Sequence, residues 1–398
     1  MKRWRAARLD ALPPYLFVEI DRRKRAALAA GKDVINLGIG DPDLPTPRFI
    51  VDRMAEAIRD PANHQYPSGT GSADFRRAVA SFCSRRFGIT LDPDREVLAV
   101  IGTKEGLGHL PLACVNPGET VLVPQPGYPV YESATIFAGA VPFHLPLTEE
   151  HGWLPQLEAI PLEVRRAARL MFLNYPNNPT GATATRRFFE EAIAFARRHD
   201  ILIAHDAAYA EMYLPATGGA RGATDPRAPS ILEVPGGREV AVELHSLSKT
   251  FNMTGWRLGF AIGNADALAA LAGIKSNMDS GQFNAIQQAG ITALEHSEHP
   301  DVRACLEVYA ERRDIVVAGL QEMGITVRAP QATFYVWARC PAGYQSMEFA
   351  GKVLEQAAVV IIPGVGFGAA GEGYFRVALT VPAERIREAL QRLRRIAF

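Results

Sequence analysis

Residues 245–257 read His-Ser-Leu-Ser-Lys-Thr-Phe-Asn-Met-Thr-Gly-Trp-Arg. An apolar run, 240–244, precedes this stretch, and a second apolar run, 258–262, follows it. Short apolar runs bounded by polar turns are typical of buried strands. Lys249 is therefore expected on a loop between two strands of a sheet.

Lys249 is framed by hydroxyl side chains, and a second cation follows it. The hydroxyls belong to Ser246, Ser248 and Thr250, and the cation is Arg257. A lysine amine that is partly desolvated beside another cation has a lowered pKa, so it can form a Schiff base with an aldehyde. Hydroxyls and a guanidinium together suit a phosphate. The pattern indicates a site for pyridoxal 5′-phosphate (PLP), although Ser-x-Ser-Lys alone is more often a solvated polar turn.

Length and composition narrow the class of protein. The chain has 398 residues, which suits a large domain plus a smaller one, and equal counts of 43 acidic and 43 basic residues. The absence of net charge argues against nucleic acid or an anionic membrane as the main partner. With no secretion signal or membrane-length apolar run, cytoplasm is expected. Scattered cysteines predict neither disulfides nor a metal site: Cys83, Cys114, Cys305 and Cys340.

The lysine segment resembles the cofactor-lysine segment of fold-type I, class I/II aminotransferases, which bind PLP. The resemblance covers nearly the whole chain and is closest to the LL-diaminopimelate aminotransferases. It is carried by Pro13-Pro-Tyr15, by residues 37–47 (Leu-Gly-Ile-Gly-Asp-Pro-Asp-Leu-Pro-Thr-Pro), by Asn116-Pro-Gly118 and by residues 245–257. One departure is Gly69-Thr70, where that subgroup usually has Tyr-Glu.

A second segment suited to an anion begins after the apolar run 96–101. Gly102 ends this run, and Thr103 and Lys104 open an expected helix. A strand that turns into a helix through glycine points free N–H groups and the positive helix end at one place. The resemblance implies that the phosphate is bound by Thr103, Lys104, Ser246, Ser248 and Arg257, and by Tyr66 reaching across the interface of a homodimer.

Asp206 closes the apolar run 201–206 and is the candidate partner of the cofactor ring. An unpaired buried carboxylate is costly, whereas one paired with a protonated pyridine nitrogen makes the ring an electron sink. The alternative is a helix cap. Tyr128 follows the run 120–123 on a proline-rich loop, and its ring could stack on the pyridine. The resemblance assigns Asn178 and Tyr209 to the ring oxygen, and catalytic roles to Lys249, Asp206 and Tyr209.

Arg376 lies in the apolar run 374–379 and is the candidate for the substrate carboxylate. A guanidinium can bind a carboxylate through two parallel hydrogen bonds. Two glycines before Asp41 predict a loop that approaches a ligand closely. The resemblance places this loop beside the substrate and implies six substrate contacts: Tyr15, Ile39, Gly40, Tyr128, Asn178 and Arg376.

The order of strands and helices predicts an α/β fold. Apolar runs alternate with helical patterns from about residue 46 to 284, which implies a mostly parallel sheet with ligands at the carboxyl ends of its strands. The resemblance implies seven strands, helices on both faces, and a smaller α+β domain. The expected divisions are 1–45 (an arm and part of the small domain), 46–283 (the PLP domain) and 284–398 (the small domain). Thr46 is expected to cap a helix with Pro47 as its first residue.

The expected activity is transamination by a ping-pong route, from an L-amino acid to a 2-oxo acid such as 2-oxoglutarate. The subgroup resemblance favours LL-diaminopimelate as donor, with an aspartate or broad-specificity aminotransferase as the alternative. A PLP-dependent lyase would use the same lysine and aspartate, so it stays open. The sequence 366–371 matches Gly-x-Gly-x-x-Gly, but an expected strand follows it instead of a helix, so no dinucleotide site is predicted.

Overall fold

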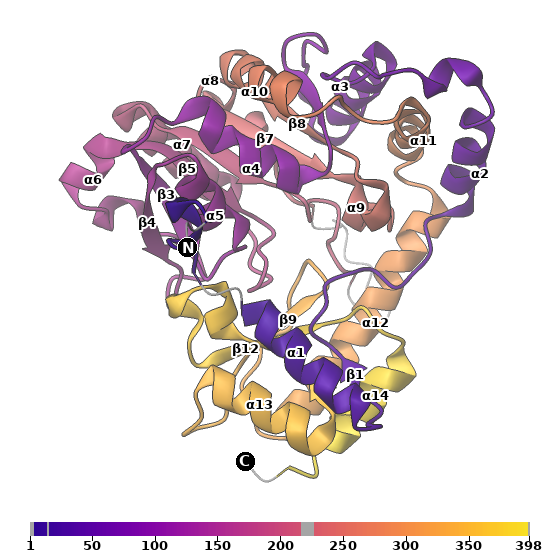
Figure 1. The fold of residues 1–398 in the computed structure, drawn as a ribbon, viewed down its shortest axis with the longest axis vertical. Helices are drawn as coiled ribbons and strands as arrows, with labels where there is room; N and C mark the ends of the chain where they lie inside the picture. Colours follow the sequence, from indigo (N-terminus) through magenta and orange to yellow (C-terminus); the bar gives the residue numbers. More distant parts are fainter. Residues whose placement is uncertain (1–3, 14–15, 216–226, 397–398) are drawn as a thin grey trace.

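The structure is a computed structural model that describes residues 4–13, 16–215 and 227–396 (Figure 1). A larger part is built on a seven-stranded sheet, and a smaller part lies below it in the view of Figure 1. Each part has its own cluster of buried apolar side chains. Among the described residues, no helix combines the length and the apolar character needed to cross a membrane.

The large sheet has the strand order β2-β8-β7-β6-β5-β3-β4. Strand β8 is antiparallel to both of its neighbours, and the other pairs are parallel. The expected mostly parallel sheet of seven strands is therefore confirmed. The strands are β2 (Val97–Val100), β3 (Thr120–Gln125), β4 (Val141–Pro146), β5 (Ala168–Asn174), β6 (Leu202–Asp206), β7 (Ala241–Ser246) and β8 (Gly259–Gly263).

Helices cover both faces of this sheet because its strands alternate apolar side chains toward each face. One apolar layer lies under α4 (Thr103–Cys114), α5 (Val130–Phe137) and α10 (Ala265–Met278). The opposite layer includes side chains of α3 (Ala73–Phe87), α7 (Arg186–His199) and α11 (Asn284–Glu295), and α2 (Arg48–Ala57) packs on α11. Shorter helices are α6 (Leu162–Ala167), α8 (Gly237–Val240) and α9 (Leu247–Thr250).

The smaller part combines two small sheets with helices. Strand order β11-β12-β9 forms an antiparallel sheet from β9 (Tyr335–Arg339), β11 (Ile362–Pro363) and β12 (Tyr374–Ala378). Strand β1 (Ile35–Asn36) pairs in parallel with β10 (Val359–Val360), which ties the N-terminal segment to the C-terminal one. The helices here are α1 (Leu16–Ala29), α12 (Pro300–Glu322), α13 (Ser346–Ala357) and α14 (Ala383–Leu393).

Short 3-10 helices complete the chain. They are η1 (Ala7–Leu9), η2 (Pro61–His64), η3 (Leu157–Ala159), η4 (Ile231–Glu233), η5 (Thr254–Trp256), η6 (Gly364–Phe367) and η7 (Ala369–Gly371). The last two contain the Gly-x-Gly-x-x-Gly sequence and lead into β12, as expected. All four cysteines are free thiols, in agreement with the sequence prediction.

Two local expectations need correction. Helix α2 begins at Arg48 with Pro47 as its N-cap, because the Thr46 hydroxyl donates instead to the carbonyl oxygen of Asn252, at 2.8 Å. Lys249 lies in the short helix α9 and not on an irregular loop. The division at residue 284 stays a prediction, although α11, which begins there, packs on α2 and α3 of the larger part.

Candidate active site

A cavity of about 370 Å³ lies at the carboxyl ends of the parallel strands, where the two parts of the protein meet. Most of the expected site residues line it: Gly40, Thr103, Lys104, Tyr128, Asn178, Asp206, Tyr209, Ser246, Ser248, Lys249, Arg257 and Arg376. Ile39 and Tyr66 are not among the lining residues, and their exposed fractions are 52% and 90%. Tyr15 lies outside the described residues.

Lys249 projects into this cavity from α9. The N-cap of α9 is Ser246, whose hydroxyl accepts from the backbone N–H of Ser248 at 3.1 Å. The Lys249 ammonium donates to the carbonyl oxygen of Gly40 at 3.1 Å. Desolvation lowers the pKa of Lys249 to about 8, and the positive charges of Arg257 and Arg376 act in the same direction. Lys249 is therefore an amine that loses its proton far more readily than a solvated lysine.

Gly102 lets the cationic side of the cavity form. Its φ of 73° is one that side chains rarely adopt, and a Cβ there would lie 2.1 Å from Nη2 of Arg257. Arg257 donates to the carbonyl oxygens of Thr254 (2.8 Å) and Ile101 (3.3 Å) and forms no ion pair with a carboxylate of the described residues. Because Thr103 begins α4 directly after Gly102, the start of a helix and a guanidinium meet there, an arrangement suited to an anion.

A buried lysine anchors the first turn of α4 from behind. The Lys275 ammonium lies 3.0 Å from a carboxylate oxygen of Glu105 and 3.0 Å from one of Asp279. Glu105 also accepts from the N–H of Ile101 at 2.9 Å and contacts His109 at 2.7 Å. Glu105, His109 and Asp279 lie close enough to hold a metal ion, but the ammonium already supplies the positive charge between the two carboxylates.

Asp206 lies at the end of β6 and is buried. Its carboxylate accepts from the hydroxyl of Tyr131 at 2.8 Å and from the N–H of Ala208 at 3.2 Å. Burial raises the pKa of Asp206, and these two hydrogen bonds oppose the rise. Tyr131 was missed by the sequence reasoning, although it follows Tyr128 by three residues, in the first turn of α5.

Arg376 lies on β12 and is buried without a carboxylate partner among the described residues. Nη1 donates to the side-chain oxygen of Asn178 at 2.8 Å, and Nη2 donates to the carbonyl oxygen of Gly38 at 2.7 Å. Its Nε is buried with no hydrogen-bond partner. A buried cation with a free donor is suited to a carboxylate or another small anion.

Tyr335 is a second residue that the sequence reasoning missed. Its hydroxyl lies 3.1 Å from that of Tyr209, and its ring lies 4.1 Å from the guanidinium carbon of Arg376. A Cβ at Gly40 would lie 1.8 Å from the Tyr335 hydroxyl, so only glycine allows this approach. Tyr335 begins strand β9, and nothing in the local sequence pattern indicates a place in the site.

The cavity brings together side chains that suit covalent chemistry at an amine and the binding of anions. A nucleophilic amine, Lys249, and a buried carboxylate, Asp206, share one cavity. A cationic corner around Arg257 suits a phosphate, and Arg376 suits a second anion. These are the groups that the sequence placed together.

Comparisons with known proteins agree with this geometry. The family model described as aminotransferase class I and II matches residues 32–393. An LL-diaminopimelate aminotransferase of Syntrophobacter fumaroxidans is 57% identical over 394 residues, which cover 99% of each chain. One of Desulforudis audaxviator is 52% identical over 98% of this chain and 97% of its own.

The substrate-bound BacF structure from Bacillus subtilis has a TM-score of 0.91 and 38% identity, and the match covers 99% of this chain and 98% of that one. This likeness confirms the fold expected from the sequence. The Lys249 amine, the Asp206 carboxylate and the cationic corner around Arg257 thus occur in a chain that matches the family over nearly its whole length. The protein belongs to the class I and II aminotransferases.

Proposed function

We propose that the protein is a PLP-dependent aminotransferase that takes its amino group from LL-diaminopimelate and gives it to a 2-oxo acid such as 2-oxoglutarate. The observation that carries the proposal is the single cavity in which the Lys249 amine, the Asp206 carboxylate and a cationic corner face one another. The donor is proposed because the relatives that carry this activity in their names match over nearly their full length.

The residues of the cavity fit PLP. The cationic corner around Arg257 would hold the phosphate. The same cavity is lined by Asp206 and by Lys249. The buried Asp206 would pair with the ring nitrogen, and Tyr128 would lie against the ring. The phosphate would contact Thr103, Lys104, Ser246, Ser248 and Arg257. When bound, PLP supplies an aldehyde that joins covalently to Lys249 and a ring that withdraws electrons from the substrate.

Lys249 is proposed to move the substrate proton. With its pKa lowered to about 8, the amine is partly neutral near neutral pH, so it can accept a proton from the substrate Cα and return it. Arg376 would bind the α-carboxylate through the edge that carries the free Nε, and Asn178 would keep the guanidinium in place. Fixing the carboxylate at one point and the amino group at another fixes the direction of the Cα–H bond.

A homodimer is part of the proposal. Tyr66 is 90% exposed and does not line the cavity of its own chain. This exposure supports the proposal that Tyr66 contacts the phosphate of a partner subunit. Ile39 and Tyr15 stay proposed substrate contacts, and a cytoplasmic location stays a prediction.

The proposal is tested with purified protein, PLP and a panel of amino donors. Glutamate formed from 2-oxoglutarate is measured with LL-diaminopimelate, aspartate, alanine and aromatic amino acids. We expect LL-diaminopimelate to give the highest kcat/KM; preference for aspartate would favour the alternative substrate, and loss of a substrate fragment without glutamate would indicate a lyase.

The variant Lys249→Ala tests the assignment of the amine. It should abolish both turnover and the visible absorbance of covalently bound PLP, because Lys104, the other lysine that lines the cavity, is assigned to the phosphate and not to the aldehyde. Lys32→Ala is the matched control, since the exposed Lys32 contacts only the carbonyl oxygen of Glu355 at 2.9 Å. Retained turnover in Lys249→Ala would refute the assignment.

A further inference from the structure

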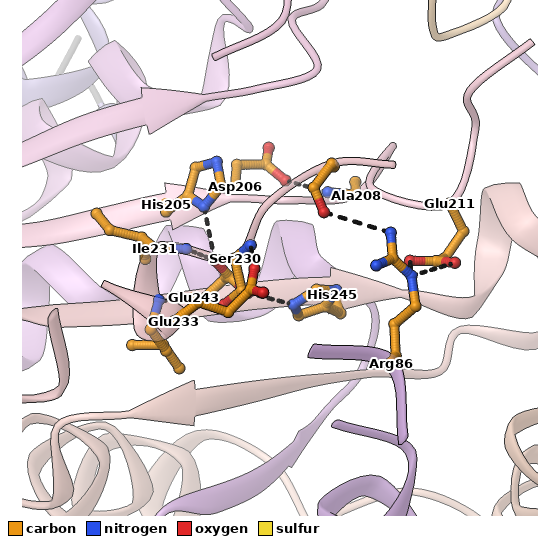
Figure 2. Close-up of polar contacts among 12 residues, drawn as sticks. Arg86, His205, Asp206, Ala208, Glu211, Ser230, Ile231, Glu233, Glu243 and His245 are labelled. Atoms are coloured by element: carbon orange, nitrogen blue, oxygen red, sulfur yellow. Dashed lines mark hydrogen bonds and ion pairs between the residues drawn. The ribbon is translucent and has the colours of Figure 1, made fainter. Parts of the chain in front are cut away.

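A carboxylate, Glu243, is buried with two histidines (Figure 2), on the face of the sheet opposite the side chain of Asp206. Glu243 lies on β7 and accepts four hydrogen bonds. The donors are His205 Nδ1 (2.9 Å), His245 Nε2 (2.7 Å), Ser230 Oγ (2.8 Å) and the N–H of Ile231 (2.9 Å). Burial alone would raise the pKa of Glu243, but the hydrogen bonds from both histidines outweigh it and hold that pKa well below its usual value. Glu243 is therefore an anion.

The hydrogen bonds of His205 decide its charge. Its Nδ1 faces the Glu243 carboxylate at 2.9 Å, and its Nε2 faces the backbone carbonyl oxygen of Tyr175 at 3.1 Å. Neither acceptor carries a proton to donate, so both ring nitrogens must donate. A neutral imidazole has only one N–H, and a histidine that donates from both nitrogens is an imidazolium. The same argument does not determine the charge of His245, because a neutral ring with one N–H can make its contact with Glu243.

The sheet fixes the position of this charge relative to the cavity. His205 and Glu243 are register partners of the parallel strands β6 and β7, so their side chains emerge side by side. Successive side chains of a strand point to opposite faces, which places His205 directly behind its neighbour Asp206. Within the described part of the chain, Asp206 itself accepts from only the hydroxyl of Tyr131 and the N–H of Ala208. The His205 charge thus acts on Asp206 through one thickness of the sheet.

We propose that His205 is a positioning residue that donates from both ring nitrogens and, held by Glu243, keeps Asp206 ionised beneath the bound cofactor. The effect on Asp206 deepens the proposed function and rests on it, whereas the charge of His205 does not. Burial raises the pKa of Asp206; the hydrogen bonds from Tyr131 and Ala208 oppose that rise, and His205 and His245 act in the same direction. A carboxylate kept ionised can hold the proton of the pyridine nitrogen, on which the ring's electron withdrawal depends.

Other ionisable groups surround the pair and do not replace it. Glu233 on η4 accepts from the N–H of Ser230 at 2.5 Å, and burial raises its pKa. Arg86 is paired with Glu211 at 2.8 Å (Figure 2). On the cavity side, the groups that face Asp206 are Tyr131, Tyr209 and Lys249.

The charge of His205 is tested directly by nuclear magnetic resonance of the unmodified protein labelled with ¹⁵N-histidine. The chain has nine histidines, and the His205 signals are those that disappear in His205→Gln. We expect both ring nitrogens of His205 to carry protons at about pH 8, with or without PLP. A neutral ring with one N–H would overturn the proposal.

The effect on Asp206 is tested with the holoenzyme and the variant Glu243→Gln. Here His205 should lose a ring proton and the pKa of Asp206 should rise further, so kcat should fall by up to about ten-fold at neutral pH as ionised Asp206 is lost. The fall should deepen toward lower pH, while KM changes less than about two-fold, because no contact with substrate is lost. A merely structural role would lower the amount of folded enzyme without altering this pH profile.

The matched control is Glu233→Gln, which makes the same change in the same cluster without touching either histidine; it should keep the imidazolium and the pH profile. His205→Gln gives a second measurement if Glu243→Gln does not fold, and it should show the same acid-side loss of kcat. An unchanged pH profile in both folded variants would overturn the proposal. If the wild-type protein fails to bind PLP, the proposed function fails, while the resonance experiment still reports on His205.

Discussion

Replacing Gly102 by alanine should weaken the binding of phosphate at the cationic corner around Arg257 without disturbing the rest of the cavity. The added Cβ would lie 2.1 Å from Nη2 of Arg257, so the guanidinium must move away. The positive φ of 73° adds a backbone penalty of about 1–2 kcal/mol. Loss of one charge-assisted hydrogen bond to phosphate costs about 1.5–3 kcal/mol, which weakens PLP binding about 10- to 100-fold.

The assay is a titration of the apoprotein with PLP and, in parallel, with pyridoxal, which lacks the phosphate. Gly102→Ala should weaken the binding of PLP and leave that of pyridoxal nearly unchanged. Gly108→Ala is the control, because Gly108 lies in the same helix with nothing within 4 Å of its added Cβ; it should be neutral or stabilise by up to about 1 kcal/mol. Equal PLP affinity in Gly102→Ala and wild type would refute the reasoning.

Three further predictions concern buried charge. Lys275→Met should lower the free energy of unfolding by about 3–5 kcal/mol, because it leaves the two carboxylates it bridges without a cation; denaturant titration measures this, with the exposed Arg187→Ala changing it by less than about 1 kcal/mol. Tyr131→Phe removes a donor to Asp206, so the pKa of that carboxyl should rise further and kcat should fall most at low pH, as a pH–rate profile will show. The apoprotein should gain stability between about pH 8 and 10.5, up to about 3 kcal/mol, because the unfolded chain holds the Lys249 proton across a window in which the folded chain has released it. Lys249→Met should remove this gain, and a gain of the same size in that variant would contradict the prediction.

The sequence was most informative where a local pattern determines the structure. Strands β5, β6 and β7 are buried on both faces, so they read as apolar runs, and the residues that end them lie at one edge of a parallel sheet. This is why Asp206 and Ser246 could be assigned to one cavity. Gly102 and the helix start after it were likewise readable, because positive φ and glycine go together.

Contacts between segments that lie far apart in the sequence could not be predicted from the sequence. Tyr131 reaches Asp206 from 75 residues away, and the partners of Arg376 lie 198 and 338 residues away. The pairing of His205 with Glu243 depends on β6 lying beside β7. The order of the strands in the sheet could not be predicted from the sequence, so this pairing could not be predicted either. Thr46 looked like a helix cap because local propensity favours that role, but a carbonyl oxygen of Asn252, far along the chain, took its hydroxyl.

The pairing of β1 with β10 and the placement of Arg376 on β12 have a consequence for biosynthesis. The N–H of Ala378 donates to the carbonyl oxygen of Leu37, the residue after β1, at 2.7 Å. A segment that is synthesised early therefore completes its hydrogen bonds only when one of the last strands has been made. A ribosome-bound chain that stops short of residue 374 contains every strand of the large sheet, with Lys249 and Asp206, yet it lacks the strand that carries Arg376. Nascent chains should therefore acquire the cofactor pocket before they acquire selectivity for amino acids.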